Sequence, residues 1–493
     1  MSHDDDAGDL CTSAAAREAA DGTVVVPDGG SDAPVERAGT SLSACFVGTS
    51  GYGADMSVLA EAQATEHIHG ICLKTGPPRR VGVELEWLVR DARDPALPVP
   101  AERIAAAVAA FGAETGTATA TGLPASPALP TSTTPVVLPS GGLLTTEPGG
   151  QLELSSLPAD SVADCVRAAA ADLASLRAAA ADAGLELAGF GLDPFRPPRR
   201  VLDLPRYAAM EAFFDRDGPW GRQMMCTTAS VQVSLDAGDD GDSHTGYRWR
   251  WRLLHAIGPV LVAAFANSPL RDGRPSGWKS SRQQVWARMD PGRTKPPPLG
   301  GDDSLDLPAA WAEYALDAQV MCVRSDGPGD WSAPPGLRLR DWLRGSDGSD
   351  GLRAPTTEDL TYHLSTLFPP VRPRGHFELR MIDAQPGDGW VVPVAVVSAL
   401  LSDAQAADAA MAAAERLWHP DGANGQDPWL LAASVGPAHP RIARASRECF
   451  AAARAALVRQ GTPAAILAAV DDFIERYVSK DRCPADDLLE ELR

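Results

Sequence analysis

The sequence predicts an α+β fold, and three observations indicate it. Ala-rich segments with helical periodicity and shorter segments with strand-like alternation both occur along the chain. The two kinds of segment do not follow a regular strand–helix–strand rhythm, so a doubly wound parallel sheet is not favoured. Four of the strand-like segments place polar residues at every second position, which gives each predicted strand one polar and one apolar face.

Alternation of apolar and polar residues predicts five strands. They span residues 81–89, 151–156, 185–192, 228–235 and 375–382. In the first, Glu84 and Glu86 share the face opposite Val83 and Leu85. The polar faces of three others carry Gln151 and Glu153; Ser230, Gln232 and Ser234; and His376, Glu378 and Arg380. If these four strands belong to one sheet, one of its faces packs on helices and the other gathers the glutamates.

Helical periodicity and low-complexity stretches divide the rest of the chain. Helices are predicted over residues 159–184, 247–265, 307–324, 393–416, 440–459 and 463–480. Residues 1–57 mix Asp, Gly, Ser, Ala and Pro without periodicity, so we expect a disordered acidic and polar tail there. A Thr-, Ala- and Pro-rich stretch at 114–142 is interpreted as an inserted loop. Without the tail, residues 58–493 form one large unit rather than the two or three domains that the length suggests.

The charge balance excludes some classes of partner. The 493 residues include 44 basic and 65 acidic side chains, a net charge of −21. Binding to nucleic acid and to anionic membranes depends on Lys and Arg, so neither partner is expected. The apolar runs are too short for a transmembrane helix, the acidic N-terminus does not resemble a secretory signal, and the eight cysteines include no C-x-x-C pair. We therefore expect small-molecule substrates, reduced thiols and a cytoplasmic location.

The glutamates on the predicted polar face have two interpretations. Antiparallel sheets commonly expose one polar face to water, and this accounts for any single strand. A face rich in Glu and nearly without Lys, however, repels itself unless a cation is bound. Hard oxygen ligands suit Mg²⁺ or Mn²⁺, with substrate phosphates completing the coordination. The chain has no H-E-x-x-H, no P-loop and no Rossmann glycine motif, so ATP would be held by metals and arginines.

Seven motifs in order carry a resemblance to a known family. They are GVELEWL (82–88), EPGGQLELSS (147–156), GRQMMCTTASVQVSLD (221–236), ANSPL (266–270), GWKSSRQQVW (277–286), EYALD (313–317) and HLSTLFPPVRPRGHFELRMIDAQP (363–386). The sequence resembles the glutamate–cysteine ligases of plants and actinobacteria, and most of all the branch that opens ergothioneine biosynthesis.

The resemblance implies both a fold and an activity. The implied fold is glutamine synthetase-like: a curved antiparallel β-sheet with the active site on its concave face and helices packed on the other. The implied reaction joins the γ-carboxylate of L-glutamate to the amine of L-cysteine through a γ-glutamyl phosphate. It consumes ATP and uses two or three Mg²⁺, and residues 58–493 would be the catalytic domain.

The resemblance also assigns roles to residues of these motifs. Metal-binding positions of the family match Glu84, Glu86, Glu147, Glu153, Gln232 and Glu378. Arg282 lies where the family binds the α-carboxylate of glutamate. Arg380, on the same strand face as the catalytic Glu378, would stabilise charge on the transferred phosphate. Arg222 is a weaker candidate for contacting substrate or phosphate. Tyr314 and Trp278 either frame a substrate pocket or are core aromatics.

The sequence leaves three alternatives open. The chain could be a γ-glutamyl ligase for another amine, because the acceptor pocket is the least readable part of the sequence. It could be a non-catalytic relative that binds glutamate or nucleotide, although such a protein has no physical reason to keep a repulsive acidic face. It could also be a guanidine kinase, whose product is phosphorylated rather than peptide-like. The pathway and the oligomeric state, monomer or dimer, are also open.

Overall fold

The structure, a computed structural model, describes residues 59–114, 135–297, 306–325, 329–345, 349, 351–418 and 427–492. The chain divides into two units, Met1–Thr40 and Ser41–Arg493, and all the described residues belong to the second. The predicted tail at 1–57 lies outside the described residues, as do residues 115–134 of the predicted inserted loop. The end of that predicted loop contains a short strand, β2 (Val136–Val137).

One antiparallel sheet contains all four predicted strands with polar faces. Its strands are ordered β2 (Val136–Val137), β3 (Leu143–Thr146), β4 (Leu152–Ser155), β1 (Val81–Asp91), β6 (Ser230–Asp236), β10 (His376–Asp383) and β9 (Val371–Pro373). β5 (Leu185–Ala188) pairs with the second half of β1, and β7 (Leu270–Arg271) and β8 (Arg274–Pro275) form a separate hairpin. The predicted α+β class is confirmed, and β4, β1, β6 and β10 are direct neighbours.

The helices and 3₁₀ turns fill the remaining described segments. They are α1 (Glu61–Cys72), α2 (Ala101–Glu114), α3 (Val162–Asp182), α4 (Pro205–Phe214), η1 (Asp215–Asp217), α5 (Trp220–Thr227), α6 (Tyr247–Ala264), α7 (Ser281–Arg288), α8 (Pro291–Thr294), α9 (Leu307–Asp317), α10 (Leu339–Arg344), α11 (Thr357–Leu364), α12 (Val391–Ser402), α13 (Ala404–Trp418), α14 (Pro428–Val435), η2 (Gly436–Ala438), α15 (Pro440–Arg459), α16 (Ala464–Arg476), η3 (Val478–Lys480) and α17 (Pro484–Glu490). The predicted helices at 159–184, 247–265, 440–459 and 463–480 are confirmed as α3, α6, α15 and α16.

Local capping explains where several helices begin. The Ser161 hydroxyl accepts a hydrogen bond from the Asp164 N–H (3.1 Å) and caps α3. The Asp306 carboxylate caps α9 in the same way. Prolines occupy the first positions of α4 and α15, where the missing N–H has no helical partner in any case.

Two predicted helices differ from the structure. The helix predicted at 393–416 is two helices, α12 and α13, which are bent by 103° relative to each other. The break lies at Asp403, whose carboxylate caps α13 by accepting from the Ala406 N–H (2.9 Å). The helix predicted at 307–324 ends at Asp317, because Val320 donates to the Leu337 carbonyl (2.7 Å) instead of continuing the helix. No described helix is by itself long and apolar enough to span a bilayer, although the bent pair α12–α13 together meets that test of length and composition.

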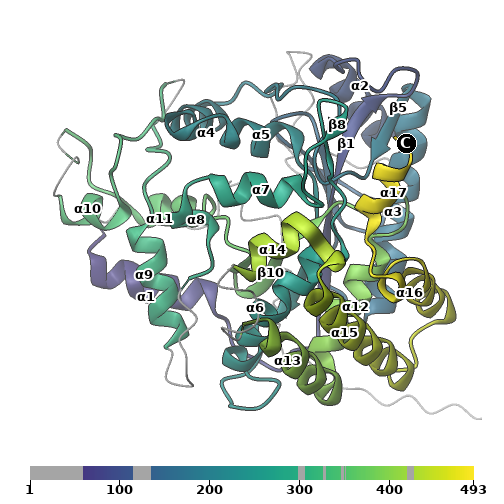
Figure 1. The fold of residues 1–493 in the computed structure, drawn as a ribbon. Helices are drawn as coiled ribbons and strands as arrows, with labels where there is room; N and C mark the ends of the chain where they lie inside the picture. Colours follow the sequence, from purple (N-terminus) through teal and green to yellow (C-terminus); the bar gives the residue numbers. More distant parts are fainter. Residues whose placement is uncertain are drawn as a thin grey trace, which may run out of the picture. The chain divides into compact units, whose positions relative to one another are not determined.

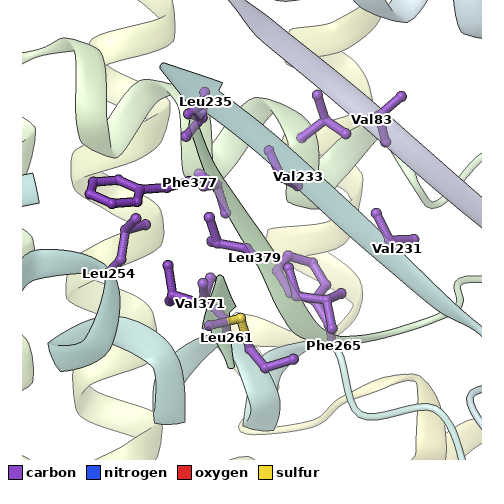
Figure 2. Packing of buried hydrophobic residues seen from close by; sticks show 14 of the residues in the cluster. Val83, Val231, Val233, Leu235, Leu254, Leu261, Phe265, Val371, Phe377 and Leu379 are labelled. Atoms are coloured by element: carbon purple, nitrogen blue, oxygen red, sulfur yellow. The ribbon is translucent and has the colours of Figure 1, made fainter. Parts of the chain in front are cut away.

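Helices cover the apolar face of the sheet. Figure 2 shows the residues that meet there: Val83, Val231, Val233, Leu235, Val371, Phe377 and Leu379 from the strands, with Leu254, Leu261 and Phe265 from α6 and the residue after it. α12 packs against β6. α13 and α15 pack against both α6 and α12, and α16 packs against α12 (Figure 1). This burial of one face leaves the other face of β4, β1, β6 and β10 for polar side chains.

A second hydrophobic cluster supports the segments that lie over the polar face. It joins α4, α5 and α7 with residues from the loops beside them, including Leu192, Phe213, Met225, Trp286 and Phe368. α5 packs against both α4 and α7 (Figure 1). The polar face of the sheet is not an open surface, because Glu84, Gln232 and Glu378 on it are buried.

Candidate active site

Strand pairing brings four of the predicted site residues together on the polar face of the sheet. β1 lies between β4 and β6, so its residues have neighbours on both sides. Glu86 is directly opposite Glu153 of β4, and Glu84 is directly opposite Gln232 of β6. Side chains of such opposed residues lie about 5 Å apart on the same face. Glu84, Glu86, Glu153 and Gln232 therefore share one face of the sheet, as strand alternation predicts.

Glu147 joins them from a tight turn before β4. The turn is closed by hydrogen bonds from the Gly150 N–H to the Glu147 carbonyl (2.8 Å) and from the Glu147 N–H to the Gln151 carbonyl (2.8 Å). The side chain of Gln151 donates to the Thr228 carbonyl (2.9 Å), which ties the turn to the segment before β6. Glu147 then lies near enough to Glu86 for the two charges to affect each other.

Glu84, Glu86, Glu147 and Glu153 form what we call the carboxylate patch. Burial, and after it the neighbouring carboxylates, raises the pKa of Glu84 and of Glu147 to about 7 and raises the pKa of Glu153 well above its ordinary value. Glu86 accepts from Gln232 Nε2 (2.8 Å), and Glu153 accepts from Thr145 Oγ1 (3.1 Å). A bound cation would favour the ionised forms of Glu84, Glu147 and Glu153 and so lower their pKa values.

Glu378 has the opposite environment, because arginines surround it. Its carboxylate accepts two hydrogen bonds from Arg372 (2.6 and 3.0 Å) and one from Arg380 (3.0 Å), and Arg374 Nη1 lies 3.6 Å from Oε1. Burial alone would raise the pKa of Glu378, but the three arginines outweigh burial and hold that pKa well below its usual range. Glu378 is therefore ionised and held in place by guanidinium groups.

Arg372 and Arg374 were not among the predicted site residues. Both come from the R-P-R sequence that forms β9 and the turn into β10, and Arg372 is directly opposite Glu378 in the resulting hairpin. Gly375 makes the turn with a φ of 77°, which favours glycine. An R-x-R sequence and a glycine before an alternating strand are the signal that could have indicated this hairpin.

Gln232 links the carboxylate patch to these arginines. Its Nε2 donates to Glu86 Oε1 (2.8 Å), and its Oε1 accepts from Arg380 Nη1 (2.5 Å). The polar face is thus acidic on β4 and β1 and basic on β10 and β9. This arrangement suits a polyanionic substrate, which arginines bind on one side and cations held by carboxylates bind on the other.

Arg282 reaches the same face from α7. It is 1% exposed, donates to the Arg380 carbonyl (2.7 Å) and lies 4.4 Å above the centre of the Trp286 ring. Burial lowers the pKa of Arg282, whereas the charges of Asp383 and Glu86 act to raise it. Its Nε and Nη1 are buried without a hydrogen-bond partner among the described residues. Buried donors are normally satisfied, so these two indicate a place for an anionic acceptor.

Arg206 and Tyr207, at the start of α4, lie near Glu147, and no sequence pattern singled them out. Burial and the Glu86 charge raise the pKa of Glu147, and the Arg206 charge acts against them. Burial, followed by the Glu147 charge, raises the pKa of Tyr207. Arg206 also donates to Ser365 Oγ (3.2 Å), which fixes its guanidinium beside the patch.

Three predicted site residues make their contacts elsewhere. Arg222 on α5 forms an ion pair with Glu211 of α4 (3.0 Å). Tyr314 stacks on Trp311 of α9, with 5.2 Å between ring centroids, and Trp278 packs against the main hydrophobic core. None of these contacts includes a residue of the carboxylate patch. The substrate roles of Arg222, Tyr314 and Trp278 therefore stay predictions.

The carboxylate patch supplies the oxygen donors that Mg²⁺ prefers. Within the described residues, no group of three or more His, Cys, Asp or Glu side chains has an arrangement that could hold a metal ion by itself. Mg²⁺ is ordinarily bound through one or two carboxylates and completes its shell with water and substrate phosphates. Burial, followed by neighbouring carboxylates, raises the pKa of Glu84 and Glu147 in spite of nearby arginines, and this gathering of carboxylate oxygens fits a cation.

Comparison with known proteins identifies relatives along most of the chain. The model of glutamate-cysteine ligase family 2 matches residues 80–491. Glutamate–cysteine ligase EgtA of Mycobacterium tuberculosis is 39% identical over 437 residues, which are 88% of this chain and 90% of EgtA. EgtA of Mycolicibacterium smegmatis is 36% identical over 445 residues, 89% of this chain and 93% of its own.

More distant relatives are plant enzymes and solved structures. The chloroplastic glutamate–cysteine ligase of Medicago truncatula is 32% identical over 242 residues, 49% of this chain and 46% of its own. The crystal structure of glutamate–cysteine ligase from Francisella tularensis in complex with AMP covers 85% of each chain at 12% identity. Its TM-score is 0.46, a likeness too slight to bear on the function.

Proposed function

The chain belongs to glutamate-cysteine ligase family 2, and from this premise we propose that it joins the γ-carboxylate of L-glutamate to the amine of L-cysteine. The reaction converts ATP to ADP and phosphate and yields γ-glutamylcysteine. The observation that carries the proposal is the divided polar face, where carboxylates of β1 and β4 face arginines of β9 and β10. Relatives of this name match about nine-tenths of the chain, so the proposal applies to the whole catalytic unit.

A carboxylate is a poor electrophile, so glutamate is activated first. An oxygen of the γ-carboxylate attacks the γ-phosphorus of ATP, ADP leaves, and γ-glutamyl phosphate forms. The cysteine nitrogen then attacks the acyl carbon, the bond to the phosphate oxygen breaks, and the amine proton passes to phosphate or to a glutamate. Catalysis of phosphoryl transfer consists mainly of positioning the reactants and neutralising charge on the phosphate oxygens.

The carboxylate patch would hold Mg²⁺, for which Mn²⁺ can substitute. When bound, the ions supply positive charge at the phosphate oxygens of ATP. Glu84, Glu147 and Glu153, whose pKa values are raised, release protons as they bind a cation, so binding is favoured at neutral or higher pH. Gln232 and Glu378 complete the proposed metal-binding set. Both oxygens of Glu378 already accept hydrogen bonds from arginines.

The arginines bind the anionic parts of the substrates. Arg282 keeps two buried donors unpaired, and they suit the α-carboxylate of glutamate. The guanidinium of Arg380 is held by Gln232 and Glu378 and stabilises the charge on the transferred phosphate. The contacts of Glu378 support a role in orienting Arg380, and its place among the metal ligands stays a prediction.

The product is a thiol precursor, and we assign it to ergothioneine biosynthesis. The support is the resemblance of the GWKS and GHFELR sequences to that branch and the similarity to EgtA proteins. We also propose a cytoplasmic location, where the substrate cysteine stays reduced. The six cysteines in the described part of the chain are buried and form no disulfide with one another, which agrees with a reducing compartment.

Incubation of the purified protein with ATP, Mg²⁺, glutamate and cysteine tests the proposal. Phosphate release is expected only when both amino acids are present, and mass spectrometry of the products should find γ-glutamylcysteine. A panel of other amines in place of cysteine checks the acceptor. Phosphate release that ignores cysteine, a phosphorylated guanidine as product, or ATP binding without turnover of any amine would each contradict the proposal.

A further inference from the structure

Asp383, the last residue of β10, is a buried carboxylate that none of the roles above uses. It is 2% exposed. Its Oδ2 accepts from the Asn267 N–H (2.9 Å) and from Ser268 Oγ (2.7 Å), and its Oδ1 accepts from Ser280 Oγ (2.9 Å). Gly191 leaves room for it, since a Cβ there would lie 2.4 Å from Asp383 Cγ. All its partners donate, so the site suits a carboxylate, which only accepts.

The two serines connect Asp383 to the first turn of α7. Ser280 is the N-cap of that helix, and its Oγ accepts from the Gln283 N–H (3.1 Å) while it donates to Asp383. The Oγ of Ser268 accepts from the Arg282 N–H (3.2 Å) while it donates to Asp383. Each hydroxyl has one proton, so the carboxylate determines the direction in which both hydroxyls donate. Their lone pairs then face the helix N–H groups.

An irregularity of β10 attaches the same helix at two more points. The register of β10 on β6 shifts after Leu379, which is the sign of a β-bulge. The carbonyls of Arg380 and Met381, inside the irregular stretch, accept hydrogen bonds from α7. Arg282 Nη2 donates to the first (2.7 Å) and Gln283 Nε2 donates to the second (2.9 Å). The end of β10 thus supports the start of α7 through Arg380, Met381 and Asp383.

The supported side chain is a guanidinium with unused donors. Among the described residues, the buried Nε and Nη1 of Arg282 have no hydrogen-bond partner. Asp383 Oδ1 lies 3.9 Å from Arg282 Nη1, which is beyond hydrogen-bond distance. Asp383 therefore balances the charge of Arg282 without occupying its donors. A substrate carboxylate can then take those donors without displacing another group.

We propose that Asp383 is a positioning residue, which holds Arg282 in place for the α-carboxylate of the amino-acid substrate. The inference rests on the proposed function, in which Arg282 binds glutamate. Asp383 acts through the hydroxyls of Ser268 and Ser280 on the first turn of α7, and through its charge on the guanidinium. Its loss therefore weakens the binding of glutamate more than the binding of ATP or cysteine.

Substitution of Asp383 with steady-state kinetics tests the inference. Asp383→Asn keeps the shape of the side chain but presents an amide N–H to partners that all donate. The KM for glutamate is expected to rise about tenfold or more, with smaller changes in kcat and in KM for ATP and cysteine, because a misplaced positioning group costs up to about 100-fold. Ser268→Ala removes one of the two hydroxyl links and is expected to raise the same KM by a smaller factor.

Asp359→Asn is the matched control. Asp359 is also a buried carboxylate near the start of a helix, α11, and it accepts from the Thr356 hydroxyl (3.0 Å) and N–H (2.9 Å). Among the described residues its carboxylate accepts hydrogen bonds from Arg353 and Thr356 and none from α7, so its substitution is expected to lower the melting temperature without a selective change in the glutamate KM.

The outcomes separate this inference from the proposed function. The inference is overturned if the Asp383→Asn and Ser268→Ala variants unfold cooperatively and keep the glutamate KM within about twofold of wild type. It is also overturned if the cysteine KM rises by as large a factor as the glutamate KM. If Asp383→Asn does not fold, Ser268→Ala decides alone.

Calorimetric titration with L-glutamate gives the second readout. A wild type that binds glutamate without ligating cysteine contradicts only the proposed function, and Asp383→Asn must still weaken that binding. A wild type that binds no glutamate overturns both.

Discussion

The glutamates of the polar face fall into two electrostatic kinds. Glu84, Glu147 and Glu153 lie near one another, and their pKa values are raised by burial and then by neighbouring carboxylates. Glu378 lies on β10, two strands from β1 and three from β4, against Arg372, and arginines hold its pKa low in spite of burial. Its charge also contributes to the raised pKa of Glu84. The first kind is costly to ionise without a cation, whereas the second is costly to neutralise.

Substitution by glutamine is therefore expected to change stability in opposite directions at Glu153 and Glu378. Without Mg²⁺ at neutral pH, Glu153→Gln raises the free energy of unfolding by about 1 to 3 kcal/mol, because a buried carboxylate is replaced by a neutral amide. Glu378→Gln lowers it by about 3 to 5 kcal/mol, because buried arginines lose their counter-charge. Both variants lose ligation by about 100-fold or more. Denaturant unfolding followed by circular dichroism measures the stabilities, and equal signs would contradict the assignment.

The raised pKa values also predict how stability depends on pH. Folding raises the pKa of Glu84 and of Glu147 from an ordinary 4.5 to about 7, so the folded state holds more protons than the unfolded state between these pH values. Stability contributed by those protons is lost as pH rises through about 7. The buried His255 and His376, with pKa values lowered to about 4, act in the opposite sense but only below 6.5.

In the presence of a chelator that removes Mg²⁺, raising the pH from about 6.5 to about 8 is thus expected to lower the free energy of unfolding. Added Mg²⁺ should reverse much of this loss, because a divalent ion replaces the protons. Glu153→Gln, which removes one of the titrating groups, should show a shallower decline than wild type. Urea unfolding across the pH range, with and without Mg²⁺, makes the measurement. An unchanged slope in the variant would show that the patch is not its source.

At the scale of an element, the turn before β4 depends on one close approach between backbones. A Cβ on Gly149 would lie 2.2 Å from the Cys226 carbonyl oxygen, so the turn that carries Glu147 packs directly on the end of α5. The sequence shows E-P-G-G as a turn, but it does not show what the turn packs against.

Gly149→Ala is expected to destabilise the protein by about 1 to 3 kcal/mol and to reduce ligation, because either the turn or α5 must move. Gly70→Ala is the matched control. Gly70 lies inside α1, nothing lies within 4 Å of its added Cβ, and alanine there should raise stability by about 1 kcal/mol with activity unchanged. Thermal melts and phosphate-release assays of both variants check this. Equal melting temperatures for both variants would contradict the packing argument.

Helices and strands could be predicted where the sequence has a strong local period. Their ends could not be predicted where a tertiary contact, rather than a local signal, terminates the element. α3, α6, α15 and α16 follow from Ala-rich periodicity with caps or glycines near their ends. The break at Asp403 is different, because periodicity continues across it and only the carboxylate cap on α13 turns the chain. Short elements such as β9 have too few residues to show a period, although β9 brings Arg372 to Glu378.

At the scale of the whole molecule, the described fold includes α1, which packs against α9 and α10. Its Glu61 carboxylate binds Arg340 (2.8 Å) and Arg344 (2.5 Å), and Ile68 is fully buried. These contacts join residues about 280 positions apart in the sequence, so α1 is packed into the described fold.

Deletion of residues 1–57 is expected to leave ligation within about twofold of the full chain, because the composition of that segment offers little apolar surface to bury. Deletion of residues 1–72, which also removes α1, is the control. It exposes the core that Ile68 covers and leaves Arg340 and Arg344 without Glu61, so the melting temperature should fall by several degrees or more. Equal melting temperatures for the two deletions would contradict the role of α1.

The ordered motifs indicated the family and its fold class, and strand alternation predicted the shared face of Glu84, Glu86, Glu153 and Gln232. Alternation was enough for the shared face because side chains on a strand alternate with a period of two whatever the strand packs against. The tertiary structure alone decided that Glu378 faces Arg372, that Glu147 reaches the patch from a turn, and that Asp383 supports Arg282. These contacts join segments up to about 100 residues apart, and they depend on strand register and helix docking, which no local period encodes.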